Sequence, residues 1–168
     1  EVLGKREIEY QSVFASVGDA TGPRLPGMKE AAIPALAKGQ EFVKPAENGL
    51  PAVPKFLPRQ QLARDLTSSE NLVFARNSVN RFWARLLGRG LVHPLDQTHS
   101  ANPPSHPKLL QALAEKFIAS EYDLKWLIRS IMLSEAYQRS SRLPDGASSV
   151  PPESYRAAIP RALTPEQL

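Results

Sequence analysis

The distribution of proline constrains the fold of this chain more than any other feature. Residues 21–58 contain seven of the sixteen prolines, together with four of the nine glycines. Proline lacks a backbone N–H donor and blocks the interior of a helix, so this stretch predicts extended loops or short strands that wrap along another part of a protein. We expect at most a short strand pairing within residues 36–57, and a short helix within residues 1–20 that ends at the turn residues 18–23.

Beyond Pro58 the hydrophobic pattern changes to that of helices. Apolar residues from Leu72 to Leu86 recur at steps of three and four, which is typical of an amphipathic helix, and Gly88 follows as a stop signal. Shorter helices are predicted within residues 60–66, 107–120 and 124–131.

Predicted caps mark where these helices begin. Ser68 or Ser69 is expected to cap the long helix, with Glu70 in its first turn, where a carboxylate favours the positive end of the helix dipole. Ser105 and Asp123 are the predicted N-caps of the next two helices.

These patterns predict an all-α fold, a small helical bundle or an orthogonal helical array. The helical core domain is expected over residues 59–142. A mostly looped, proline-rich lead-in over residues 1–58 precedes it, and residues 143–168 form a loop and a truncated helix start at Thr164. The first residues include neither an initiating Met nor an apolar stretch, so we expect the chain to be an excised or processed piece.

Composition excludes several classes of function. The chain has no Cys, which excludes disulfides, thiolate metal sites, cysteine nucleophiles and covalent c-type haem attachment within it. No window approaches the roughly 18 consecutive apolar residues of a membrane span. The net charge of +4 is spread among interspersed acids, so no nucleic-acid partner is expected. No nucleophile elbow, phosphate loop or dinucleotide motif is present, and we assign no catalytic residue.

Arginines on the predicted long helix form the main candidate surface. Arg81, Arg85 and Arg89 are spaced four residues apart, and Arg76 and Asn80 form a second pair at this spacing. The planar guanidinium group suits carboxylates and phosphates, so this face could bind an anionic ligand or partner. It could equally be a solvated face whose arginines pair with acids of the same chain, for example Arg76 with Asp65 or another arginine with Asp96. Asn80 lies beside the apolar stripe and could cap a neighbouring backbone segment.

Three histidines, His93, His99 and His106, lie in one loop with Asp96 between them. Imidazole is a common metal ligand, but structural zinc sites bring close ligand pairs on defined turns, and that spacing does not occur here. We therefore assign no metal, and His106 joins Arg76, Asn80, Arg81 and Arg85 as the candidate ligand or partner surface. Most aromatics are expected in the core, while Trp126 and Tyr137 could form a stacking platform at its edge.

Several ordered motifs resemble a known family. The chain is similar over residues 59–142 to the planctomycete-type domain of unknown function 1553. The resemblance implies an exported protein of the periplasm or cell envelope, in which this domain sits at the C-terminal end and a cytochrome-c-like module often precedes it. It supplies no biochemical activity. The motifs that carry it are Leu62–Asn71, Phe74–Trp83, Leu87–Val92, Asn102–Leu110 and Ser134–Ser141.

Two hypotheses of function follow. In the first, the chain is a non-catalytic helical module that packs against the preceding domains of its parent protein, or binds an envelope protein or a glycan. In the second, it is an accessory domain of a haem-linked redox or degradative enzyme whose haem lies in the parent protein, with no cofactor in this chain. The second hypothesis expects Arg76, Asn80, Arg81 and His106 to line one cleft.

Overall fold

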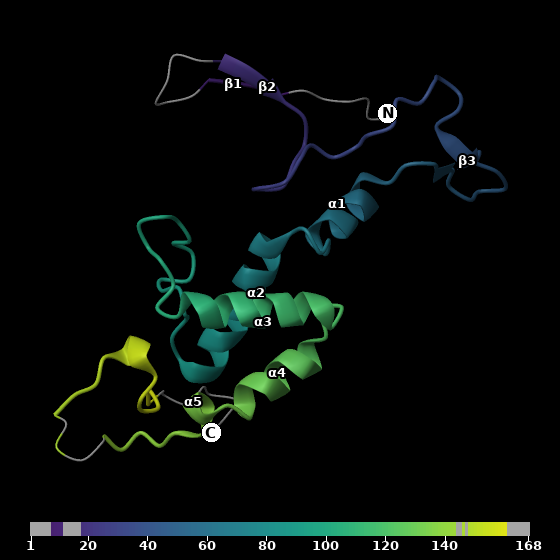
Figure 1. The fold of residues 1–168 in the computed structure, drawn as a ribbon. Helices are drawn as coiled ribbons and strands as arrows, with labels where there is room; N and C mark the ends of the chain where they lie inside the picture. Colours follow the sequence, from purple (N-terminus) through teal and green to yellow (C-terminus); the bar gives the residue numbers. More distant parts are fainter. Residues whose placement is uncertain (1–7, 12–17, 144–145, 147, 161–168) are drawn as a thin grey trace. The chain divides into compact units, whose positions relative to one another are not determined.

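The computed structural model describes residues 8–11, 18–143, 146 and 148–160. The chain forms two compact units, Glu1–Asn71 and Leu72–Leu168. About 38% of the chain is helix and 11% is strand, in five helices and two small antiparallel sheets within the described residues (Figure 1). The prediction of an all-α fold is therefore wrong, and the fold is mixed. The predicted helix start at Thr164 lies outside the described residues.

The first unit contains both sheets. Strand β1 (Ile8–Gln11) pairs antiparallel with β2 (Gly18–Thr21), so the predicted short helix within residues 1–20 is wrong. In β1, apolar Ile8 and Tyr10 alternate with polar residues, and this period of two fits a strand. Strand β3 (Phe42–Lys44) pairs antiparallel with β4 (Val53–Pro54), which confirms the short pairing expected within residues 36–57.

Local polar contacts, rather than a core, hold the loops of the first unit. The Glu30 carboxylate accepts hydrogen bonds from the Gly22 amide at 2.9 Å and the Thr21 hydroxyl at 3.3 Å. Between β3 and β4, Glu47 and Leu50 exchange two backbone hydrogen bonds across Asn48 and Gly49. Both central residues have positive φ, 51° and 76°, which is the geometry that Asn-Gly favours in tight hairpins.

Helix α1 (Pro58–Leu66) closes the first unit and confirms the helix predicted there. Pro58 occupies the first turn, where its missing N–H costs nothing. The buried side chain of Asn71 donates hydrogen bonds to the carbonyls of Leu66, at 3.2 Å, and Asp65, at 3.4 Å. These carbonyls lie at the end of the helix, where no intrahelical donor remains for them.

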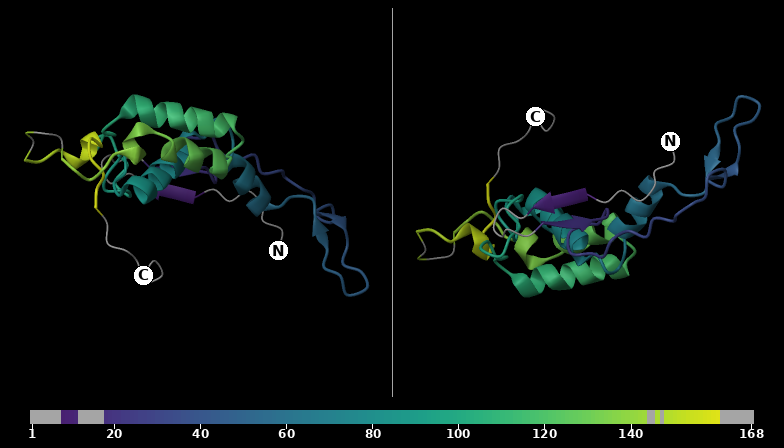
Figure 2. Two further views of the ribbon diagram at one scale, coloured as in Figure 1. Left: turned by 90° about the horizontal axis from the view of Figure 1, so that it is seen from below. Right: turned by 90° about the horizontal axis from the view of Figure 1, so that it is seen from above.

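The second unit is helical. It contains α2 (Leu72–Leu87), α3 (Pro107–Ala119), α4 (Leu124–Met132) and α5 (Glu135–Gln138), followed by the 3₁₀ turn η1 (Pro152–Ser154). Helix α2 packs against both α3 and α4 (Figure 2). The core consists mainly of side chains from these three helices and from the loop after α2. Its buried members are Val79, Trp83, Leu91, Val92, Leu110, Phe117, Leu127, Ile131 and Tyr155.

The observed helix ends confirm some predicted signals and correct others. Gly88 follows α2 with a φ of 87°, and the Asp123 carboxylate accepts hydrogen bonds from the amides of Lys125 (2.8 Å) and Trp126 (3.1 Å) at the start of α4. Ser105 does not cap α3, because its hydroxyl and amide both donate to the Leu91 carbonyl. His106 precedes α3 instead and makes no side-chain cap.

The predicted start of the long helix is also corrected. Helix α2 begins at Leu72 and has no acidic residue in its first turn. The Ser68 hydroxyl accepts from the Glu70 amide at 3.2 Å, so these residues form a separate local turn before the helix. A serine bonded to the amide two residues later is equally at home in a turn and at a helix start, and the sequence alone did not distinguish them.

Candidate functional site

Asn80 is the most deeply buried of the predicted site residues, with 2% of its surface exposed. Its amide group donates to the Val92 carbonyl and accepts from the Val92 amide, both at 2.9 Å. This confirms the expectation that Asn80 caps a neighbouring backbone segment. A Cβ atom on Gly90 would lie 2.5 Å from the Val92 oxygen and 2.9 Å from the Asn80 oxygen, so only glycine fits there.

The arginines of α2 contact separate partners. Arg76 donates to the Gln111 side chain on α3, and Arg81 forms an ion pair of 2.5 Å with Asp96 in the loop after α2. Arg85 is exposed in the last turn of α2. These side chains and Asn80 therefore engage different groups of the protein.

The histidines also have local contacts. The Nδ1 atom of His106 lies 3.1 Å from the Ser105 hydroxyl oxygen, and Nδ1 of His99 accepts from the Ala101 amide at 3.2 Å. Since the Ser105 hydroxyl donates to the Leu91 carbonyl, His106 does not withdraw its proton in this arrangement. Among the described residues, no group of three or more His, Cys, Asp or Glu side chains could hold a metal ion.

Tyr155 is a central residue that the sequence did not single out. It is 6% exposed, and its hydroxyl lies 2.8 Å from the Gly90 carbonyl and 3.2 Å from the Arg89 carbonyl, to which it donates. Its ring packs edge-on against Trp83, with centroids 5.4 Å apart, and against His106 at 5.7 Å. Tyr155 thereby anchors the C-terminal segment to the helical core. No local pattern around it signals this role, because its partners lie more than 60 residues earlier.

Burial raises the pKa of Tyr155, because it disfavours the charged phenolate. The nearby Trp83 and Ser105 side chains and the positive charge of Arg89 oppose this effect in part, while Glu153 adds to it. The phenol therefore stays protonated at neutral pH and acts as a hydrogen-bond donor. Burial likewise raises the pKa of Tyr122.

The anchored segment forms one wall of a pocket of about 250 Å³. The end of α2 and helix α5 provide the other walls. Tyr137, which was expected to lie at the edge of the core, is part of the lining, whereas Trp126 packs against the core. The lining residues are Leu86, Leu87, Ala136, Tyr137, Tyr155, Ala157, Ala158 and Ile159.

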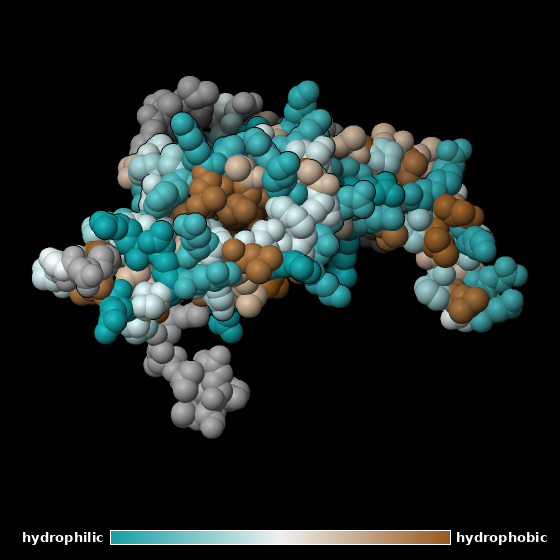
Figure 3. Space-filling view, turned by 60° about the horizontal axis from the view of Figure 1, so that its bottom comes forward, coloured by the Kyte–Doolittle hydropathy of each residue, from teal (hydrophilic) through white to brown (hydrophobic). Residues whose placement is uncertain are grey.

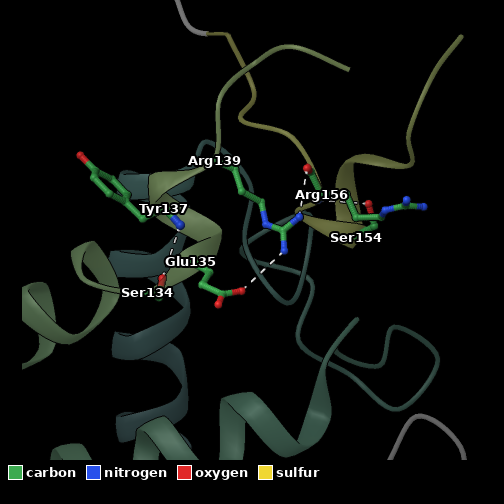
Figure 4. A network of polar contacts seen from close by, with 6 residues as sticks. All are labelled: Ser134, Glu135, Tyr137, Arg139, Ser154 and Arg156. Carbon is green, nitrogen blue, oxygen red and sulfur yellow. Dashed lines mark hydrogen bonds and ion pairs between the residues drawn. The ribbon is translucent and has the colours of Figure 1, made fainter. Parts of the chain in front are cut away.

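Polar contacts join the two sides of this pocket (Figure 4). Arg139 extends from the end of α5 and donates to the Arg156 carbonyl at 3.4 Å, while its guanidinium lies 3.9 Å from the Glu135 carboxylate. The Ala158 amide donates to the Ser140 carbonyl at 3.0 Å. At the start of α5, the Ser134 hydroxyl accepts from the Tyr137 amide at 3.4 Å.

The described lining contains apolar side chains and one phenol that faces the pocket's edge, Tyr137, besides the bonded Tyr155. It has no paired carboxylates and no nucleophile beside a base, which acid–base or covalent catalysis requires. This chemistry suits the binding of an apolar group. The predicted arginine face and the pocket are thus different parts of the second unit, and the pocket was not predicted.

Comparison with known proteins places the chain in a family. Within the described residues, no helix has both the length and the apolar character needed to cross a bilayer. No curated protein and no solved structure matches the chain. The model of one family, PSD1, described as a protein of unknown function (DUF1553), matches residues 58–168. Since this match covers more than half of the sequence, the chain belongs to the DUF1553 family.

Proposed function

We propose that this chain is a packing and binding module of an exported multidomain protein, and that residues 8–57 pack along a neighbouring domain of that protein. One observation carries the proposal: no hydrophobic side chain in the described part of this segment is buried. The buried hydrophobic residues of the described chain all lie between Ala75 and Tyr155.

A segment without a core needs another surface to bury its apolar side chains. Two-stranded hairpins are marginally stable in water by themselves, and the β3–β4 region exposes an unusual number of large apolar side chains for its length. Apolar atoms are visible on the surface in Figure 3. The exposed residues of this region are Phe42, Val43, Leu50, Val53 and Leu57. A neighbouring domain that covers them would supply the missing hydrophobic contacts.

The polar side chains support a binding role over a catalytic one. Arg76, Asn80 and Arg81 each bond a group of the same chain, so their side chains contribute to stability without a substrate. The exported location and the multidomain parent belong to the proposal and rest on the family resemblance of residues 59–142. The haem-linked alternative requires that the same side chains act on a cofactor bound elsewhere in the parent.

Hydrogen exchange can test the packing of residues 8–57. The parent polypeptide, purified from the native cell envelope, would be compared with this chain alone. We expect the amides of Phe42–Lys44 and Val53 to exchange much more slowly in the parent, because a covering domain would protect them. Val43→Asp should remove that protection, while Leu133→Asp, an equally exposed apolar position in the second unit, should leave it unchanged.

Equal exchange of these amides in the parent and in the isolated chain would contradict the packing role. The haem-linked alternative has its own readout. A haem-dependent turnover of the parent that is lost in both Arg76→Gln and His106→Ala, with protein folding retained, would favour that alternative.

A further inference from the structure

We propose that the pocket formed by α2, α5 and residues 155–159 binds an extended segment of a partner protein that carries one leucine-sized apolar side chain next to a carboxylate. This site lies wholly in the second unit and is separate from the packing of residues 8–57. Its lining is apolar, with aliphatic Leu86, Leu87 and Ile159 and three alanines among its members. Small alanines on two walls leave the space that an incoming side chain would fill.

The size of the pocket limits the apolar part of the ligand. A volume of about 250 Å³ is below the range of about 300–1,000 Å³ that is usual for drug-sized molecules. It has room for a single branched side chain together with part of the backbone that carries it. A larger fused-ring cofactor would exceed this space, so a peptide side chain is the ligand that fits best.

The charge at the pocket comes from Arg139. Its guanidinium spans the two walls through the Arg156 carbonyl, and its only printed charge partner in the structure is Glu135 at a distance of 3.9 Å (Figure 4). The Glu135 side chain is 95% exposed and that of Arg139 is 44% exposed, so the ion pair contributes little to stability. A carboxylate from the partner can replace Glu135 at small cost and can form two parallel hydrogen bonds with the guanidinium.

The proposal can be tested with three short peptides whose termini are blocked. The probes are acetyl-Gly-Leu-Glu-Gly-amide, its Gln analogue and its Ala-Glu analogue, each titrated into the ¹⁵N-labelled full chain. We expect the Leu-Glu peptide to shift the amide signals of Ala136, Ala157 and Ala158 saturably. The Gln analogue should bind about three- to fivefold more weakly, the range of one exposed ion pair. The Ala-Glu analogue should show no saturable shift, because it leaves the pocket empty.

Variants separate the pocket from the charge. Ala158→Leu fills the pocket and should abolish binding of the Leu-Glu peptide. Arg139→Gln should retain binding but lose the preference for Glu over Gln. Lys116→Gln removes the same charge from an exposed position on α3, a helix that contributes no described lining residue, and should retain both affinity and preference.

Two results would overturn the proposal. One is the absence of a saturable shift at the pocket amides with the Leu-Glu peptide in the unmodified chain. The other is equal affinity for the Leu-Glu, Leu-Gln and Ala-Glu peptides. Should Ala158→Leu fail to fold, the peptide series and Arg139→Gln still decide the question.

Discussion

At the scale of single residues, two side chains hold the turn that follows α2. Asn80 bonds both backbone groups of Val92, and the Tyr155 hydroxyl bonds the carbonyl of Gly90. The loop has to enter the core here, since Leu91 and Val92 are buried. Its backbone polar groups would be desolvated without partners, which costs more than an ordinary hydrogen bond contributes. These two residues therefore make the buried path of the loop possible.

Replacement of Asn80 should reveal this role. We expect Asn80→Ala to lower the free energy of unfolding by about 2–4 kcal/mol, because two buried backbone groups of Val92 lose their partners. Asn77→Ala, at an exposed position of the same helix, should change it by less than about 0.5 kcal/mol. Urea denaturation followed by circular dichroism measures both. A similar small effect of the two substitutions would show that Val92 finds other partners.

Alkaline titration should reveal the burial of Tyr155. The pKa of this phenol is raised above the model value of 10.0, so the unfolded chain releases the proton at a lower pH than the folded chain does. The stability is therefore fully present below pH 10 and decreases as pH rises through the folded-state pKa. We expect Tyr155→Phe to be less stable at pH 7, by about 1 kcal/mol for the lost hydrogen bond, and to lose stability less steeply above pH 10.

Thermal unfolding at several pH values between 7 and 11 checks this expectation. Tyr122 has a raised pKa as well, so the variant should retain part of the alkaline loss. Identical slopes for the natural chain and Tyr155→Phe above pH 10 would contradict the assignment.

At the scale of elements, local signals determine where the helices of the second unit begin and end. Helix α4 starts where Asp123 accepts two amide hydrogen bonds, and α2 stops before Gly88, which has the positive φ that glycine tolerates best. Helix α3 has no side-chain cap and depends on its buried face. Three of its residues, Leu110, Ala114 and Phe117, lie in the interior.

The Asp123 cap can be tested by a matched pair of substitutions. Asp123→Ala should destabilise the chain by about 0.5–2 kcal/mol, because the first amides of α4 lose their acceptor. Asp123→Asn keeps a side-chain oxygen at the same place and should retain most of the stability. Melting curves of the three proteins at neutral pH measure the difference. Equal losses in both variants would assign the effect to charge rather than to capping.

At the scale of the whole molecule, hydrophobic burial is distributed unevenly along the chain. The described residues before Asn71 contain no buried hydrophobic side chain, whereas α2, α3 and α4 of the second unit share one core. Because burial of apolar surface is the main stabilising contribution in folding, the second unit should determine the stability of the isolated chain. The first unit has hairpins and local hydrogen bonds, and its apolar side chains are available to a neighbouring domain.

This distribution predicts a contrast between two truncations to alanine. Phe117→Ala, in the core, should destabilise the isolated chain by about 3–5 kcal/mol. Val43→Ala, at an exposed strand position, should change its stability by less than about 0.5 kcal/mol. Calorimetry of the isolated chain compares the two. A large loss for Val43→Ala would mean that the β3–β4 region already has a hydrophobic partner within this chain.

The sequence by itself determined the helices and some of their ends. The spacing of apolar residues located α1 to α4, and Gly88 and Asp123 were correctly assigned as stop and cap. These features depend on contacts within about four residues along the chain, so a local pattern contains the necessary information. The same patterns could not reveal the β1–β2 pairing, because a strand needs a partner strand and its few residues are compatible with several structures.

Only the tertiary structure decided the partners of the candidate site. It directs Asn80 to Val92, Arg76 to Gln111 and Arg81 to Asp96, and it brings Tyr155 against a carbonyl 65 residues earlier in the chain. The pocket exists because that anchor places residues 155–159 beside α2 and α5. Contacts between distant segments depend on how whole faces pack together, and no spacing within a single helix or loop specifies them.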